Sequence, residues 1–140
     1  MPNLPRFHMA FPVHTLAEAR HFYGEVMGCA EGRSSSHWVD FDFFGHQIVA
    51  HLGDEPRDRQ LTSEVDGEDV PLRHFGVILT MEQWQELIDR LLAANIAFVI
   101  PPAIRFKGQP GEQATCFLYD PSGNALEFKA FADDSMVFAR

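Results

Sequence analysis

Residues 7–28, FHMAFPVHTLAEARHFYGEVMG, decide the fold because this stretch contains a strand, a helix start and a helix stop. Residues 7–13 place apolar side chains on one face in alternation, which is typical of a half-buried strand. Thr15 and Glu18 form a capping box, a helical stripe of apolar residues follows, and Gly28 supplies the C-terminal stop. We therefore expect a strand that leads directly into a capped helix.

Three further strands complete a first module. A weak candidate covers 29–33, and stronger candidates at 38–44 and 47–52 flank a tight turn at Gly45-His46. The order of elements is then strand, helix and three strands, a βαβββ module.

The second half of the chain repeats this plan. Thr80 and Gln83 form a second capping box, again directly after a predicted strand. The expected elements are a strand at 73–79, a helix from Thr80 to near Asn95, a strand at 96–100 that Pro101-Pro102 stops, and a hairpin of 115–119 and 124–130 around Asp120-Pro121-Ser122-Gly123. Two βαβββ modules are the simplest description.

The predicted fold class is therefore α+β, with two βαβββ modules that form a curved mixed sheet around a trough. We expect one domain over 1–140, with module one at about 5–52, a connector at 53–71 and module two at about 72–132. The connector is acidic and poor in apolar residues, so it is predicted to be a solvated linker or a lid. The sequence leaves open whether the trough is built within one chain or across a dimer.

Composition narrows the functional classes. Hydrophobic residues make up 46% and charged residues 22% of the 140, as in ordinary globular proteins. The net charge is −9 and the cations are scattered, which argues against nucleic acid and anionic membranes as partners. No apolar stretch is long enough to span a bilayer, the N-terminus has no signal-peptide pattern, and the two cysteines lack CxxC spacing. We expect a cytoplasmic protein in a reducing compartment.

Four polar residues lie on strand faces and form the candidate site. His8 and His74 lie on the first strands of the two modules, just before each capped helix, and His51 and Glu127 lie on the last strands. The four are interpreted as two pairs of pseudo-equivalent positions. They converge if the modules pack side by side around a trough.

A metal ion explains this set best. An enclosed carboxylate needs a counter-ion, and two imidazoles with one carboxylate form the facial set that holds Fe(II), with Mn(II) as a substitute. We expect His8, His74 and Glu127 to be the ligands, while His51 is either a further ligand or an acid/base. Tyr119 shares its strand face with Thr115 and Phe117 and is a candidate hydrogen-bond donor to substrate.

Other chemistries have weaker support. The polar loop Ser34-Ser35-Ser36-His37 lacks an acidic partner for a serine hydrolase, and no glycine-rich phosphate motif is present. Arg105 and Lys107 precede a flexible segment that can bring cations over an anionic ligand, although solvated loop charges also explain them.

At this point the chain resembles the vicinal oxygen chelate superfamily, which includes glyoxalase I, type I extradiol dioxygenases, and fosfomycin and bleomycin resistance proteins. The resemblance covers nearly the whole chain and implies a metal in the trough of a paired βαβββ fold. The motifs that carry it are FHMAFPV at 7–13, ARHFY at 19–23 with Gly28, HFGV at 74–77 and FLYDPSGNALE at 117–127.

The resemblance to extradiol dioxygenases implies that His8, His74 and Glu127 ligate the metal, that His51 is the acid/base, and that Tyr119 assists. We therefore expect a ring-cleaving oxidoreductase, with Fe(II) as its cofactor, acting on a small molecule that chelates the metal through vicinal oxygens. The alternative is a glyoxalase I-type lyase or isomerase that uses Ni(II), Zn(II) or Co(II), with His51 where that enzyme usually has a glutamate. A ligand-binding protein without chemistry is a third reading, and the resemblance implies a homodimer.

Overall fold

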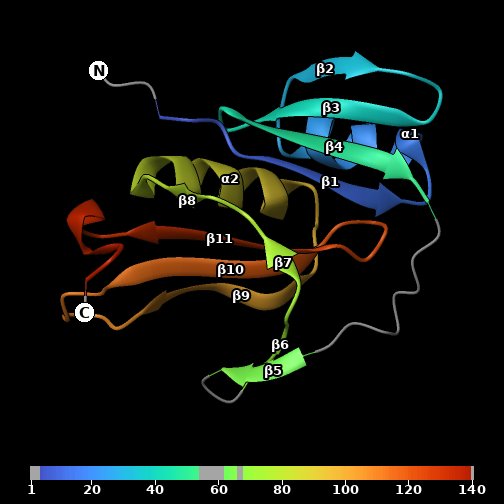
Figure 1. Ribbon diagram of the computed structural model, residues 1–140. Helices are drawn as coiled ribbons and strands as arrows, with labels where there is room; N and C mark the ends of the chain where they lie inside the picture. The colour runs from blue at the N-terminus through green and yellow to red at the C-terminus, as the bar shows by residue number, and fades with distance from the viewer. Residues whose placement is uncertain (1–3, 54–61, 66–67, 140) are drawn as a thin grey trace. The chain divides into compact units, whose positions relative to one another are not determined.

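The computed structural model describes residues 4–53, 62–65 and 68–139, and its elements are drawn in Figure 1. The chain divides into two compact units. Unit 1 comprises Met1–Arg57 with Asp120–Asn124, and unit 2 comprises Asp58–Tyr119 with Ala125–Arg140.

Unit 1 is one mixed sheet covered on one face by helix. Its elements are β1 (His8–Val13), α1 (Leu16–Ala19), η1 (Arg20–Val26), β2 (Glu31–Ser34), β3 (Trp38–Phe43) and β4 (His46–Leu52). The strand order is β1-β4-β3-β2, with β1 parallel to β4. Phe11, Phe41 and Ile48 are buried on one face, where the ring of Tyr23 lies 5.4 Å from Phe11 and 5.6 Å from Phe41. The other face of the sheet carries the polar candidates.

Unit 2 repeats this topology. Its elements are β5 (Thr62–Val65), β6 (Glu68–Pro71), β7 (His74–Phe75), β8 (Ile78–Leu79), α2 (Met81–Ala93), β9 (Phe98–Arg105), β10 (Gln113–Tyr119), β11 (Ala125–Phe131) and η3 (Asp134–Met136). The main sheet has the order β7-β11-β10-β9, and β8 also pairs with β11. As in unit 1, the first strand is parallel to the last. The prediction of an α+β fold with two βαβββ modules is confirmed.

Both helices start at the predicted threonines, but only the second start has the full predicted capping box, because the Glu18 carboxylate contacts His14 instead. The hydroxyl of Thr15 accepts the backbone N–H of Glu18, and Thr80 and Gln83 form a reciprocal capping box. The first helix differs in its second part, because η1 is a π-helix in which the N–H of Met27 reaches the carbonyl of Phe22. The apolar stripe alone does not distinguish this winding from an α-helix.

Three predicted strand or turn boundaries were wrong. The hairpin turn lies at Phe44-Gly45, where both residues have positive φ, and not at Gly45-His46. β9 continues through Pro101 and Pro102, because it is the outer strand of its sheet and the missing N–H groups break no ladder on its free side. The strand expected at 73–79 is divided into β7 and β8.

The connector contains more structure than a solvated linker. β5 and β6 pair as an antiparallel hairpin, while residues 54–61 and 66–67 of the predicted connector lie outside the described residues. Val70 on β6 is buried and packs in a cluster with Phe117 and Ala125. The end of the connector therefore contributes to the core of unit 2.

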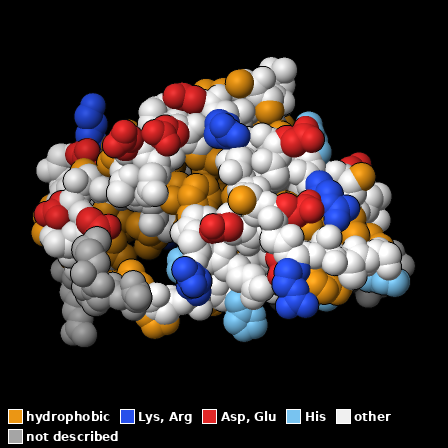
Figure 2. All heavy atoms as spheres, turned by 90° about the horizontal axis from the view of Figure 1, so that it is seen from above, with side chains coloured by type: hydrophobic (Ala, Val, Ile, Leu, Met, Phe, Trp, Pro, Cys, Tyr) orange, Lys and Arg blue, Asp and Glu red, His pale blue; other side chains and the backbone are white. Residues whose placement is uncertain are grey.

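The surface is mixed in charge. On the face shown in Figure 2, Lys and Arg side chains lie singly among Asp and Glu and form no continuous basic patch. Among the helices in the described part of the chain, none has the length and apolar character needed to cross a membrane.

Candidate metal and substrate site

His74 on β7 has a fixed ring orientation. Its Nδ1 lies 2.7 Å from the carbonyl oxygen of Pro71, and a carbonyl only accepts, so Nδ1 must carry the proton and donate. In the neutral imidazole Nε2 then carries the lone pair, and it lies 3.6 Å from Oε1 of Glu127. The ring also packs edge-on against Phe117, with centroids 4.9 Å apart. The structure thus presents an imidazole nitrogen and a carboxylate oxygen side by side.

Glu127 on β11 is held close to the first strand by a glycine. Its side chain is only 17% exposed, and Lys129 Nζ lies 3.7 Å from Oε1. A Cβ on Gly76 would lie 1.6 Å from the backbone oxygen of Glu127, so no other residue fits there without moving a strand. Gly76 lies between β7 and β8, where the predicted strand is interrupted. Close approach of the two backbones is therefore built into the site.

This pair fits a divalent metal. Two ligands about 2.1 Å from one ion are separated by roughly 3–3.6 Å, which matches the spacing of His74 and Glu127. A metal-ligating histidine commonly donates its other ring N–H to a carbonyl or carboxylate, as His74 does to Pro71. Among the described residues, no group of three or more histidine, cysteine or acidic side chains is close enough to hold an ion. Unit 2 therefore offers two of the three predicted ligands.

Tyr119 lies on the same face of unit 2. The register of β10 and β11 pairs Tyr119 with Ala125 and Phe117 with Glu127, so Tyr119 lies two residue pairs from the glutamate and on the same face. The tyrosine side of this face is open, with Tyr119 41% exposed, while Phe117 is buried. His74, Glu127 and Tyr119 therefore lie on one face of the unit 2 sheet.

The other two predicted residues lie on the exposed face of the unit 1 sheet. His8 pairs with Gln47 in the register of β1 and β4, whereas His51 pairs with Pro12 and, on its other side, with Trp38. His51 is four residues beyond Gln47, about 13 Å along the strand. His8 and His51 therefore share a face of unit 1 without being neighbours.

The registers also correct the predicted equivalence of His51 and Glu127. The residue four places beyond the partner of the first-strand histidine is His51 in module one and Lys129 in module two. The counterpart of Glu127 is Val49. The sequence alone does not identify this counterpart, because the pairing of the first strand with the last strand must be known in each module.

Two further polar residues on these faces were missed as candidates. Gln47 lies beside His8, and its Nε2 donates to Oδ2 of Asp40 at 3.2 Å. Lys129 lies beside Glu127. The sequence feature that could have identified them is the alternation of side chains along each last strand, which puts Gln47 on the face of His51 and Lys129 on the face of Glu127.

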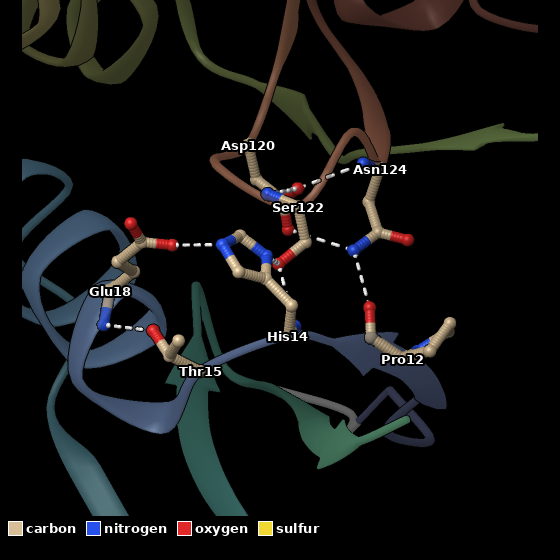
Figure 3. A network of polar contacts seen from close by, with 7 residues as sticks. All are labelled: Pro12, His14, Thr15, Glu18, Asp120, Ser122 and Asn124. Atoms are coloured by element: carbon tan, nitrogen blue, oxygen red, sulfur yellow. Dashed lines mark hydrogen bonds and ion pairs between the residues drawn. The ribbon is translucent and has the colours of Figure 1, made fainter. Parts of the chain in front are cut away.

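A separate polar network in unit 1 fixes the turn at 120–124 (Figure 3). Asp120 accepts hydrogen bonds from the backbone of Ser122 and Asn124, from the side chain of Asn124, and from the hydroxyl of Tyr23 at 2.8 Å. Asn124 also donates to the carbonyl of Pro12 at 2.8 Å. Burial raises the pKa of Asp120, although these hydrogen bonds oppose that rise, and burial raises the pKa of Tyr23 well above its usual value. The turn is thus locked by a buried carboxylate.

The same turn contains the residue types of a catalytic triad. His14 Nδ1 lies 2.7 Å from Ser122 Oγ, and His14 Nε2 lies 2.6 Å from Glu18. However, Ser122 Oγ also accepts the backbone N–H of His14, and the backbone N–H groups of Ser122, Gly123 and Asn124 all donate to Asp120. Because these N–H groups already donate hydrogen bonds within the turn, they do not form an oxyanion hole there, and we interpret the network as structural.

The thiols are likewise structural. Cys116 on β10 is fully buried, and burial raises its pKa to about 12. Cys29 is also buried, and the two cysteines form no disulfide with each other. A buried thiol with so high a pKa is a weak nucleophile.

The sequence of residues 7–128 matches the family model described as "Glyoxalase/Bleomycin resistance protein/Dioxygenase superfamily". The chain belongs to this superfamily. The prediction of vicinal oxygen chelate membership is therefore confirmed. Among curated proteins, none matches the chain significantly.

Solved structures of the superfamily share the fold. A glyoxalase/bleomycin resistance protein/dioxygenase from Alicyclobacillus acidocaldarius is 36% identical, with a TM-score of 0.79 over 99% of this chain and 100% of its own. A fosfomycin resistance protein from Listeria monocytogenes is 20% identical, with a TM-score of 0.64 over 93% of each chain. A glyoxalase/dioxygenase from Nostoc punctiforme is 16% identical, with a TM-score of 0.68 over 90% of each. The last two show a common fold only.

Proposed function

We propose that this protein is a metal-dependent enzyme of the extradiol dioxygenase type, which cleaves the ring of a small substrate that chelates the metal through vicinal oxygens. The observation that carries the proposal is the pairing of His74 Nε2 with Glu127 Oε1 at 3.6 Å. The proton that His74 donates to Pro71 supports it, because this contact leaves Nε2 free to ligate.

In this proposal His8, His74 and Glu127 hold the ion, with Fe(II) as the preferred metal and Mn(II) as a substitute. When bound, such an ion supplies a Lewis-acidic centre with open positions for substrate and dioxygen. Glu127 balances its charge, and the partial burial of this carboxylate limits access of water. Phe117 restrains the ring of His74, so the ligand orientation is set before metal binds.

His51 and Tyr119 act on the substrate. His51 takes up a proton from a substrate hydroxyl and returns it later, because an imidazole nitrogen can both accept and donate a proton. Tyr119 donates a hydrogen bond to a substrate oxygen from the exposed end of β10. Both are proposed to contact substrate rather than metal.

The alternative is a glyoxalase I-type lyase or isomerase, which uses Ni(II), Zn(II) or Co(II) with a fourth protein ligand. The register disfavours His51 as that ligand, because it lies four residues from the partner of His8. Gln47 occupies the adjacent position and is a poor substitute for a carboxylate. A binding protein without chemistry predicts no metal dependence.

The test is oxygen consumption by protein loaded anaerobically with Fe(II) and then supplied with catechols and air-saturated buffer. We expect one O₂ consumed for each ring-cleaved product, and a loss of roughly 100-fold in kcat for His51→Ala with iron retained. His37→Ala, on an exposed loop, is the matched control. Iron bound at one per chain without oxygen uptake on any catechol would refute the dioxygenase assignment.

The proposal extends to the assembly. We propose that residues 1–140 act as a single domain of two modules in a cytoplasmic homodimer, and that each dimer binds small molecules only. Sedimentation measurements at micromolar concentration test the dimer.

A further inference from the structure

Lys129 is a cation on the same face as the candidate site. It follows Glu127 by two residues on β11, so both side chains leave the sheet on one face. Lys129 pairs with Thr115 in the register, two residue pairs from Glu127 and Phe117 and on the same face. The chain contains two lysines, and the other, Lys107, lies in an exposed turn after β9.

In the described part of the chain, the ammonium of Lys129 forms an ion pair with Glu127. Nζ lies 3.7 Å from Oε1 of Glu127, beyond hydrogen-bonding distance, and this is the oxygen that faces His74. A divalent ion held by Glu127 satisfies the carboxylate and repels the ammonium. The side chain of Lys129 is 39% exposed and has room to turn to another anion.

We propose that Lys129 binds an anionic group of the substrate, and that the site selects molecules that carry a carboxylate beside their two chelating oxygens. This inference rests on the proposed function and adds the substrate class. It also agrees with the overall charge. A chain of net charge −9 repels small anions, so recognition of one requires a local cation such as Lys129.

The test compares ligands that differ by one carboxylate. Full-length protein loaded anaerobically with Fe(II) is titrated calorimetrically with catechol, 2,3-dihydroxybenzoate and 3,4-dihydroxybenzoate. We expect the better carboxylated ligand to bind wild-type protein roughly tenfold more tightly than catechol. Lys129→Met is expected to remove this difference while changing the affinity for catechol by less than about threefold.

Two variants control for charge and for general effects. Lys129→Arg keeps the cation and is expected to retain most of the preference, and Lys107→Met is expected to behave as wild type. An unchanged preference in Lys129→Met, with all ligands bound, would overturn the inference and leave the proposed function standing. Wild-type protein that holds iron and binds none of the three ligands would refute the proposed function and this inference with it.

Chemical labelling gives a second readout that a purely structural lysine would not change. Because the chain has two lysines, acetylation of each can be followed by peptide mass spectrometry. With iron present, the carboxylated ligand is expected to slow acetylation of Lys129 severalfold, while catechol has a smaller effect and Lys107 is unaffected. Equal protection by catechol and by the carboxylated ligand would contradict a role in binding the carboxylate.

Discussion

Replacement of Tyr23 by phenylalanine tests whether a buried carboxylate locks the turn at 120–124. The variant keeps the ring that packs against Phe11 and Phe41 and removes only the hydroxyl that donates to Asp120 at 2.8 Å. A hydrogen bond to a charged group contributes about 1.5–3 kcal/mol. Asp120 keeps the donors from Ser122 and Asn124, so we expect the free energy of unfolding to fall by about 2 kcal/mol at pH 7.

The loss should depend on pH, and its sign follows from the pKa of Asp120. Burial raises this pKa in the folded state, so folded protein binds more protons than unfolded protein between the two pKa values, and stability falls as pH rises through that window. The hydroxyl of Tyr23 lowers the folded pKa. Its removal raises that pKa further, so the loss in Tyr23→Phe should grow as pH rises and be smallest where Asp120 is protonated in both states.

Urea unfolding followed by tryptophan fluorescence between pH 3.5 and 8 measures this difference. The chain has two tyrosines, and Tyr119→Phe, at an exposed position, is the matched control with an expected change below about 0.5 kcal/mol. A loss for Tyr23→Phe that is the same at every pH, or no larger than that of Tyr119→Phe, would refute the reasoning.

Three other predictions follow from single contacts. Gly76→Ala should destabilise the protein by more than about 3 kcal/mol and abolish metal binding, because its Cβ would overlap the backbone of Glu127. Gly111→Ala, with open space around it, is the control and should do neither. Urea unfolding measures the stability of both variants, and metal analysis measures their metal content. Thr80→Ala removes the capping box of α2 and should lower the free energy of unfolding by about 1 kcal/mol, measured in the same way; no change would contradict the capping role. Cys116, with a pKa near 12, should not react with a thiol reagent at pH 8 until urea is added, and prompt reaction of folded protein would be inconsistent with its burial.

The parts of the fold that depend on local chemistry could be predicted from the sequence. Thr15 and Thr80 identified both helix starts, because a side-chain cap involves residues only three apart. Pro101 and Pro102 were misleading, since a proline ends a central strand but not an outer one, and the position of β9 in its sheet is a long-range property. The π-helical winding of η1 also gave no local signal.

The candidate site could be predicted from the sequence only in part. His74 and Glu127 were identified by their positions on first and last strands, and the structure brings them within 3.6 Å in unit 2. The equivalence of His51 and Glu127 was wrong. It depends on which residues of the first and last strands pair, and alternation along one strand does not give that register. Lys129 was recognised only as a neighbour on the face of Glu127, and its ion pair required the packed structure. The roles of all five candidates, His8, His51, His74, Tyr119 and Glu127, stay predictions.

The central claim is that His74 and Glu127 are metal ligands, and elemental analysis tests it most directly. Wild-type protein, His74→Ala, Glu127→Gln and His51→Ala are loaded anaerobically with equimolar Fe, Mn, Ni, Co and Zn, dialysed and analysed. We predict about one metal per chain, iron or manganese, in wild type and His51→Ala, and loss of it in the other two variants. Metal retained at wild-type level in folded His74→Ala and Glu127→Gln would contradict the account.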